Sequence, residues 1–201
     1  MTTDSWNARY ATSTNLFGDS PNEFLVSHKS YFKPGMTALA IGDGEAQNGI
    51  WLAQQGLVVT SVDNSEVAHQ KAKRHAKEAG VTMTIICSDI LDYLSTDKKY
   101  DIIVHFFVHL PMPLKQTLHQ KIINSLNPNG YVLLECFHKE QLLCGSGGPK
   151  DINMLYDEAE IQTDFKQLKI TTLQKKLTDV YEETRGSQPG VSLQFAGFKD
   201  S

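Results

Sequence analysis

Two glycines flank an acid, Gly42-Asp43-Gly44, where an apolar run meets a helix-like segment in the stretch ALAIGDGEAQNGIWLAQQ (38–55). A strand that ends at glycines lets the backbone approach a nucleotide-like ligand closely. The turn also carries two acids, Asp43 and Glu45, so a pyrophosphate would meet like charges at short range. The residue types therefore favour a ligand that is uncharged or cationic beside the turn.

The turn matches neither of two common nucleotide-binding patterns. The dinucleotide fingerprint G-x-G-x-x-G needs a third glycine where this chain has Gln47, and a P-loop needs a lysine that the turn lacks. S-adenosylmethionine fits better, since it has no phosphate and carries a positive sulfonium and an ammonium group. A nicotinamide-dependent oxidoreductase stays open as an alternative, although the missing glycine counts against it.

Two further acids follow predicted strands. Asp63 ends a β-branched run about 20 residues beyond the glycines, where a carboxylate can accept hydrogen bonds from both ribose hydroxyls. A nicotinamide cofactor would use the same acid, so Asp63 alone does not discriminate. Asp89, in the stretch SDI (88–90), ends the next strand and can accept a hydrogen bond from an adenine amino group. The carboxyl ends of these strands are therefore the predicted nucleoside site.

The elements that must position these residues alternate along the chain. Near-continuous apolar strands separated by helices predict a parallel sheet covered on both faces. After residue 150, a helix and two strand-like runs joined by TRGSQPG predict an antiparallel hairpin. The predicted strands are 37–42, 57–63, 81–89, 100–107, 131–137, 168–183 and 191–198, with a turn at 127–130, and the predicted helices are 22–32, 46–55, 65–80, 112–126 and 157–165.

The successive stretches ALAIGDGEAQNGIWLAQQG, VTSVDNS, CSDI, YDIIV and LNPNGYVLLE resemble the motifs of class I S-adenosylmethionine-dependent methyltransferases. The leader WNARY…FGDSPNEFL, together with GEAQN and GGP (147–149), resembles the small tellurite-resistance-type subgroup. The resemblance implies an α/β fold: a Rossmann-like, seven-stranded, mostly parallel sheet with an antiparallel C-terminal hairpin and helices on both faces. One domain, 1–201, would comprise a leader or lid with a helix (1–36), a cofactor-binding core (37–137) and a C-terminal part (138–201).

The resemblance also implies site residues, with S-adenosyl-L-methionine as the cofactor. The transferred methyl would lie near His105, and His105 or His138 would serve as a base if the acceptor must lose a proton. Four positions depart from the family pattern: Ala40, Ala46, Gln47 and Asn129. The expected cofactor-binding residues are Arg9, Tyr10, Gly42, Asp43, Gly44, Asn48, Asp63, Asn64, Ser65, Ser88, Asp89, Ile90 and His105.

The implied reaction is methyl transfer to a small-molecule nucleophile, such as an oxyanion of tellurium or selenium, or a thiol. Because Ala40 and Ala46 replace residues usual in the family, a degenerate, non-catalytic module that binds S-adenosylmethionine or S-adenosylhomocysteine is the alternative. Turnover distinguishes the two.

Composition limits the partners. The 201 residues carry a net charge of -4, which argues against a large nucleic-acid surface. No apolar run is long enough to span a bilayer and the N-terminus lacks secretory-signal character, so a cytoplasmic protein is expected. Cys87, Cys136 and Cys144 form no CxxC pair, which predicts reduced thiols and no metal site. The sequence leaves open a monomer or a homodimer.

Overall fold

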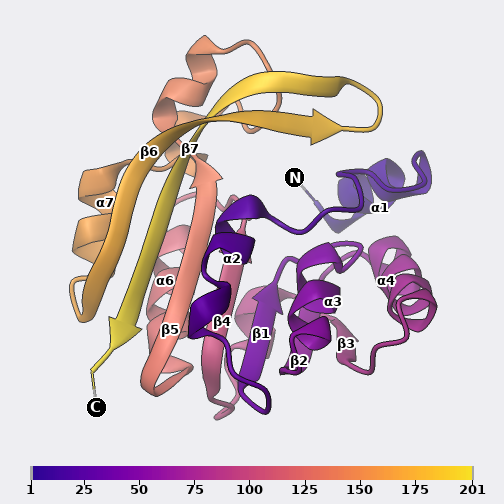
Figure 1. Ribbon diagram of the computed structural model, residues 1–201. Coiled ribbons are helices and arrows are strands. Elements are labelled where there is room, and N and C mark those ends of the chain that lie inside the picture. Colours follow the sequence, from indigo (N-terminus) through magenta and orange to yellow (C-terminus); the bar gives the residue numbers. More distant parts are fainter. Residues whose placement is uncertain (1, 201) are drawn as a thin grey trace.

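The computed structural model describes residues 2–200 and shows a single seven-stranded sheet in the order β3-β2-β1-β4-β5-β7-β6 (Figure 1). Strands β1 to β5 pair in parallel, whereas β7 runs antiparallel to both β5 and β6. The predicted fold class is therefore confirmed. The strands are β1 Thr37–Ile41, β2 Val58–Asp63, β3 Thr84–Cys87, β4 Tyr100–Phe106, β5 Leu126–Phe137, β6 Leu168–Glu182 and β7 Gly186–Lys199.

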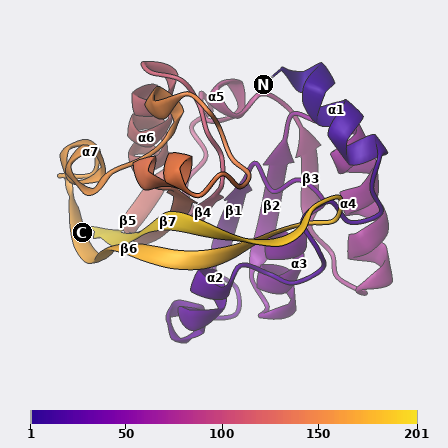
Figure 2. The same cartoon turned by 90° about the horizontal axis from the view of Figure 1, so that it is seen from above.

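Helices cover both faces of the sheet (Figure 2). Helices α2 and α3 bury one apolar cluster against it, and α5, α6 and α7 bury a second. Alternate residues of β1 enter different clusters, Ala38 and Ala40 one and Leu39 and Ile41 the other, as the period of a strand requires. The helices are α1 Thr3–Ala11, α2 Glu23–Ser27, α3 Gln47–Gln54, α4 Glu66–Glu78, α5 Ile90–Tyr93, α6 Leu114–Asn124 and α7 Glu158–Asp164, and the 3-10 turns are Lys29–Tyr31, Lys139–Leu143 and Ile152–Met154.

Several predicted boundaries were wrong. The predicted helix 22–32 breaks after Ser27 into a 3-10 turn, and β3 begins at Thr84 instead of 81. The stretch NPNG is no separate turn, because it belongs to β5 and places Asn129 at a φ of 61°. The hairpin connection is also much shorter than TRGSQPG, since β7 already begins at Gly186.

The leader contains a helix, α1, that the sequence pattern did not predict. Its residues are mostly polar, so the hydrophobic periodicity that marks a helix is weak. Thr2 caps its first turn, and Tyr10 packs against Ala68 of α4 in a small apolar cluster. Long-range packing therefore stabilises α1 where local pattern does not.

Candidate cofactor site

The glycine turn follows β1 directly and requires its glycines. Gly42 and Gly44 have φ values of 59° and 54°, in the left-handed region that side chains disfavour. A Cβ atom on Gly42 would overlap the Val108 side chain, and one on Gly44 would overlap the Tyr10 hydroxyl. The backbone therefore approaches its neighbours more closely than any other residue type allows.

Ala46 also adopts the left-handed region, with a φ of 70°, directly before α3. The family usually has glycine at this position, and the structure shows why: the turn keeps the glycine conformation although the residue is alanine. The strain costs on the order of 1–2 kcal/mol. Its backbone N–H donates to the Asp43 carbonyl at 2.8 Å, so the turn remains closed.

Asp43 supports the turn from beneath. Its buried carboxylate accepts hydrogen bonds from the Gly49 backbone N–H at 3.1 Å and from the Ser61 hydroxyl at 2.9 Å. Burial raises the pKa of Asp43 to about 7, against the lowering effect of the hydrogen bond from Ser61. The side chain thus ties the turn to α3 and β2, and only its backbone is available to a ligand above the turn.

Asp63 ends β2 beside this turn. One carboxylate oxygen accepts from the Gly44 backbone N–H at 3.0 Å, and the other accepts from the Ser65 backbone N–H at 2.9 Å. Burial raises the pKa of Asp63, and the backbone N–H donors of Ser65 and Gly44 oppose that shift. Each carboxylate oxygen can accept more than one hydrogen bond, so Asp63 retains capacity for hydroxyl donors.

The two residues that follow Asp63 differ in their exposure and contacts. Ser65 is buried, caps α4 by accepting from the Ala68 N–H, and donates its hydroxyl to the Asn7 side chain at 2.7 Å. Its hydroxyl therefore holds the leader. Asn64, between Asp63 and Ser65 in the chain, is partly exposed.

The predicted adenine residues lie next to Asp63. The Ser88 backbone N–H donates to the Asp63 carbonyl at 2.9 Å, which joins the two strand ends. Asp89 is exposed and uses one carboxylate oxygen to cap α5. The Ile90 side chain lies 3.7 Å from where a Cβ of Gly42 would be. The structure therefore brings the turn, Asp63 and residues 88–90 to one place.

Residues of the leader also lie beside the glycine turn. Tyr10 is buried with its hydroxyl against Gly44, and burial, then the charge of Asp63, raises its pKa. Arg9 forms an ion pair of 3.0 Å with Glu182 near the tip of the β6–β7 hairpin. Figure 1 shows this hairpin extending across the carboxyl ends of the strands toward α1.

A buried ion pair fastens the leader to the core. Glu45 accepts from the Leu16 backbone N–H at 2.7 Å and pairs with Lys71 of α4 at 2.8 Å. The same lysine donates to the backbone carbonyls of Tyr10 and Ser13, each at 2.6 Å. Glu45 is therefore a structural anchor of the leader, a role that its position in the sequence did not reveal.

Asn48 lies on α3, the helix that follows the turn. Its side-chain oxygen accepts from the Asn22 backbone N–H at 2.9 Å, and Asn22 donates to the buried Glu135 carboxylate at 2.8 Å. Ser192 also donates to Glu135, at 2.6 Å. Asn48 therefore connects the cofactor turn to β5 and β7, and no local signal in the sequence marks Glu135 for this network.

His105 is a core residue, which corrects the expectation that it lines the acceptor site. Its side chain is fully buried beside His119 and Tyr156, with Nδ1 at 3.4 Å from the Cys136 thiol. Burial lowers the pKa of His105 to about 3, so it stays neutral at physiological pH. The histidine sits in an apolar strand, and the sequence could not show to which face it points.

His138 lies directly after β5 with both ring nitrogens occupied. Nδ1 accepts from the Glu140 backbone N–H at 3.1 Å, and Nε2 is 3.2 Å from the Glu158 carboxylate. These bonds fix the ring as a cap of the following 3-10 turn. The predicted base is thus engaged in structural contacts.

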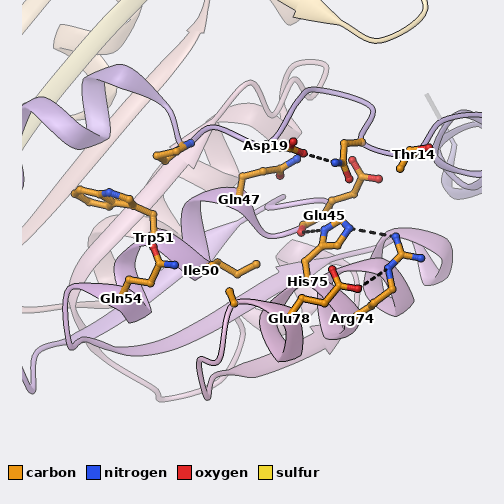
Figure 3. A pocket seen from close by; sticks show the side chains of 13 residues that line it. Thr14, Asp19, Glu45, Gln47, Ile50, Trp51, Gln54, Arg74, His75 and Glu78 are labelled. Atoms are coloured by element: carbon orange, nitrogen blue, oxygen red, sulfur yellow. Dashed lines mark hydrogen bonds and ion pairs between the residues drawn. The ribbon is translucent and has the colours of Figure 1, made fainter.

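A well-defined hollow lies at a different place. It measures about 750 Å³ and lies between the loop after α1 and the outer sides of α3 and α4, lined by Gln47, Trp51 and His75 among others (Figure 3). Gly42, Gly44 and Asp63 do not line it. The strand ends instead hold the Tyr10 and Val108 side chains close to the glycines. This hollow is therefore separate from the predicted cofactor residues.

Within residues 2–200, no helix has the length and apolar character needed to cross a membrane. Cys87, Cys136 and Cys144 form no disulfide with one another.

Comparisons with known proteins agree with this geometry. Residues 38–130 match the family model described as a methyltransferase domain. A curated relative, 2-heptyl-1-hydroxyquinolin-4(1H)-one methyltransferase of Mycobacteroides abscessus, is 26% identical over 165 residues, which cover 81% of this chain and 70% of the relative.

Two solved structures share the fold at low identity. One, from work on the conversion of a disulfide bond into a thioacetal group during echinomycin biosynthesis, has a TM-score of 0.81 at 14% identity and covers 99% of this chain and 93% of its own. TehB from Haemophilus influenzae has a TM-score of 0.75 at 17% identity, with coverage of 89% and 62%. These two structures show that the fold is shared. The methyltransferase-domain match and the curated relative, together with the strand order, the glycine turn and Asp63, support a class I methyltransferase that uses S-adenosylmethionine as its cofactor.

Proposed function

We propose that this methyltransferase acts on a small, soft nucleophile: an oxyanion of tellurium or selenium, or a thiol. The observation that carries the proposal is the placement of the predicted bases. His105 is neutral inside the core, and both ring nitrogens of His138 are engaged. A chalcogen lone pair or a thiolate needs no base to attack the sulfonium methyl, so the reaction requires mainly alignment and exclusion of water.

Two structural neighbours are consistent with a soft acceptor. One structural neighbour is described by sulfur chemistry, the conversion of a disulfide into a thioacetal, and the likeness to TehB is consistent with the tellurite-resistance-type subgroup. Aromatic rings also lie at the ends of β4 and β5, where Phe107 and Phe137 pack 4.9 Å apart. A ring face near the sulfonium would contribute roughly 0.5–2 kcal/mol.

The proposed cofactor contacts follow from the geometry of the strand ends. Gly42 and Gly44 pass beneath the methionine part, and Asp63 accepts hydrogen bonds from the ribose hydroxyls, with Asn64 beside it. Ser88, Asp89 and Ile90 surround the adenine. Asp43 and Ser65 position these residues without contacting the cofactor through their side chains, because those side chains already bind Ser61 and Asn7.

The leader would act as a lid. Tyr10 lies against Gly44, so α1 must shift for the methionine part to enter and then close over it. Closure would exclude water and bring Arg9 toward the carboxylate of the cofactor. Amide exchange with and without S-adenosylhomocysteine tests this: residues 3–16 should gain protection on binding. Equal exchange in both states would make the leader a fixed strap.

Transfer of labelled methyl groups tests the proposed acceptor. The acceptors are selenite, tellurite, a small thiol and, as a hard-oxygen control, a catechol. We expect turnover with at least one soft acceptor and much less with the catechol. Preference for the catechol would contradict the proposal. Binding of S-adenosylhomocysteine without turnover of any acceptor would instead favour the non-catalytic module that Ala40 and Ala46 leave open.

A further inference from the structure

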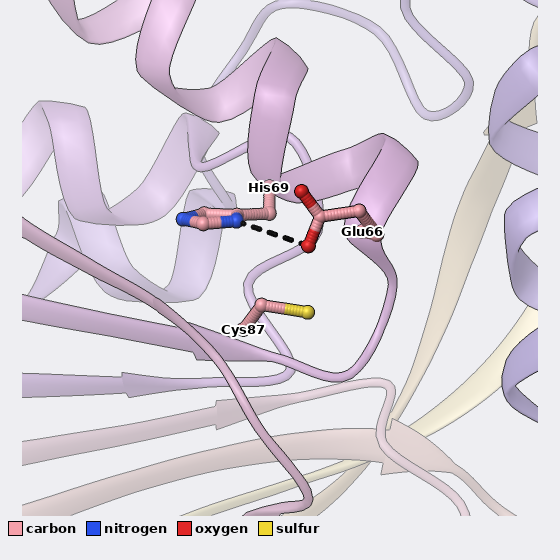
Figure 4. A group of neighbouring side chains, drawn as sticks. All are labelled: Glu66, His69 and Cys87. Atoms are coloured by element: carbon pink, nitrogen blue, oxygen red, sulfur yellow. Dashed lines mark ion pairs between the residues drawn. The ribbon is translucent and has the colours of Figure 1, made fainter.

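Three side chains with metal-binding atoms face one another at the outer edge of the sheet (Figure 4). Glu66 and His69 lie three residues apart at the start of α4, on one face of the helix. Cys87 is the last residue of β3, the edge strand. One ligand atom from each side chain lies within 4.8 Å of the other two.

The hydrogen bonding of His69 is a second observation, independent of the distances, that points to a ligand here. Both of its ring nitrogens are buried, and neither has a hydrogen-bond partner among residues 2–200. The nearest charged group to Nδ1 is the Glu66 carboxylate at 3.5 Å, longer than an ordinary hydrogen bond. The side chain is 13% exposed, but a buried ring nitrogen that lacks a partner is costly, and a ligand placed between His69 Nδ1 and Glu66 would remove that cost at Nδ1.

We propose that Glu66, His69 and Cys87 bind one divalent zinc-type cation. Carboxylate, imidazole and thiolate are the donors that zinc prefers, whereas magnesium and calcium select oxygen alone. Zinc–ligand bonds of about 2.0–2.3 Å in a tetrahedron separate the donors by about 3.3–3.8 Å. The 3.5 Å between His69 and Glu66 already matches, and rotation of a side chain would close the remaining gap.

Binding replaces the proton of the Cys87 thiol by the metal, and that proton leaves to solvent. The three protein ligands leave a fourth position for water. No motif such as CxxC announced this site, because its ligands come from two elements that are adjacent only in the folded chain. The sequence prediction of no metal site rested on local spacing.

The site adjoins the predicted nucleoside contacts. Glu66 follows Asp63-Asn64-Ser65 directly, Cys87 precedes Ser88-Asp89, and Asp63 lies opposite Cys87 in the β2–β3 register. An ion held by α4 and β3 would fix both strand ends and so pre-organise them for adenosine. This coupling, unlike metal binding itself, rests on the proposed cofactor contacts.

Cobalt(II) titration of the full-length, reduced protein tests the metal site. We expect one equivalent of cobalt to produce a thiolate-to-cobalt charge-transfer band, which one equivalent of zinc abolishes. Cys87→Ser should remove the band, and His69→Gln and Glu66→Gln should weaken binding at least tenfold. The matched controls, Cys144→Ser and His75→Gln, should bind like the parent. Absence of the band, or a band that survives Cys87→Ser, would overturn the proposal.

Calorimetry with S-adenosylhomocysteine tests the coupling. Zinc should tighten binding at least fivefold in the parent and leave Cys87→Ser unaffected. Equal affinity with and without zinc in the parent would refute the coupling. If the cobalt band is present and S-adenosylhomocysteine binds in neither state, the cofactor assignment fails and the metal site stands.

Discussion

The two halves of the sheet hold their functional ends differently. At β1 and β2, the glycine turn and Asp63 are linked by backbone hydrogen bonds over short sequence distances, such as Gly44 to Asp63. Beyond the ends of β4 and β5, the chain contacts a segment from much farther along: the Tyr156 hydroxyl donates to the Val108 carbonyl, and His109 Nδ1 lies 3.0 Å from the Met154 carbonyl. The turn and Asp63 in the proposed cofactor half are thus joined mainly by local bonds, whereas the proposed acceptor half, at β4 and β5, depends on long-range packing.

The buried Asp43 should give the largest effect, because it tests how strongly the cofactor turn is tuned by burial. Its pKa is about 7 in the folded chain against an ordinary 3.8. The folded state therefore holds a proton that the unfolded chain releases, and stability falls as pH rises from about 4 to about 7. Over this pH range the free energy of unfolding decreases by roughly 4 kcal/mol in total.

Urea unfolding of Asp43→Asn between pH 4 and pH 7.5 checks this. The amide keeps an acceptor for Gly49 and Ser61 but has no charge. The free energy of unfolding of the variant should therefore rise relative to that of the parent by about 4 kcal/mol between pH 4 and pH 7.5. Asp179→Asn, at an exposed position on β6, is the control and should parallel the parent. Parallel curves for Asp43→Asn would show that burial of this carboxylate has little cost.

Gly44→Val should abolish cofactor binding, with a loss above 100-fold or about 3 kcal/mol. The side chain would occupy the space beside Tyr10 that the methionine part needs. Gly80→Val is a matched control, since Gly80 has a φ of 67° with nothing near its Cβ position. It carries the same backbone strain away from the site. If both variants bind S-adenosylhomocysteine equally well by calorimetry, Gly44 is only a turn residue.

Asp63→Ala should weaken S-adenosylhomocysteine binding about 30- to 150-fold, since charge-assisted hydrogen bonds to two hydroxyls are worth roughly 2–3 kcal/mol. Calorimetry measures the change. Asp101→Ala removes a carboxylate at the opposite end of the sheet, where it binds Thr37, and should leave affinity unchanged. Unchanged affinity in Asp63→Ala would remove the ribose assignment.

His105→Leu should have the smallest effect and tests the acceptor half. Because the histidine is buried and neutral, turnover at pH 7 should stay within about twofold of the parent, with the same pH–rate profile. Thermal unfolding confirms that the variant is folded. A folded variant whose turnover falls tenfold or more would return His105 to the catalytic residues.

The same contrast explains what the sequence could and could not predict. The sheet, the glycine turn and the acids after β2 and β3 follow from periodicity and spacing, which are local properties. Whether His105 faces a helix or a ligand depends on which neighbours pack against β4, and periodicity does not contain that information. The roles of Lys71 and Glu135 are equally hidden, because their partners are 26 or more residues away.

The hydrogen bonds between the leader and the β6–β7 hairpin set the order in which the two halves can fold during synthesis. The Glu183 carboxylate accepts from the Thr14 and Asn15 backbone N–H groups, 169 and 168 residues away. On the ribosome, residues 10–16 can dock on Glu45 and Lys71 while the rest of the chain is still being made. The hydrogen bonds to Glu183 form only after nearly the whole chain has emerged. A nascent chain therefore completes its cofactor turn long before its acceptor side can close.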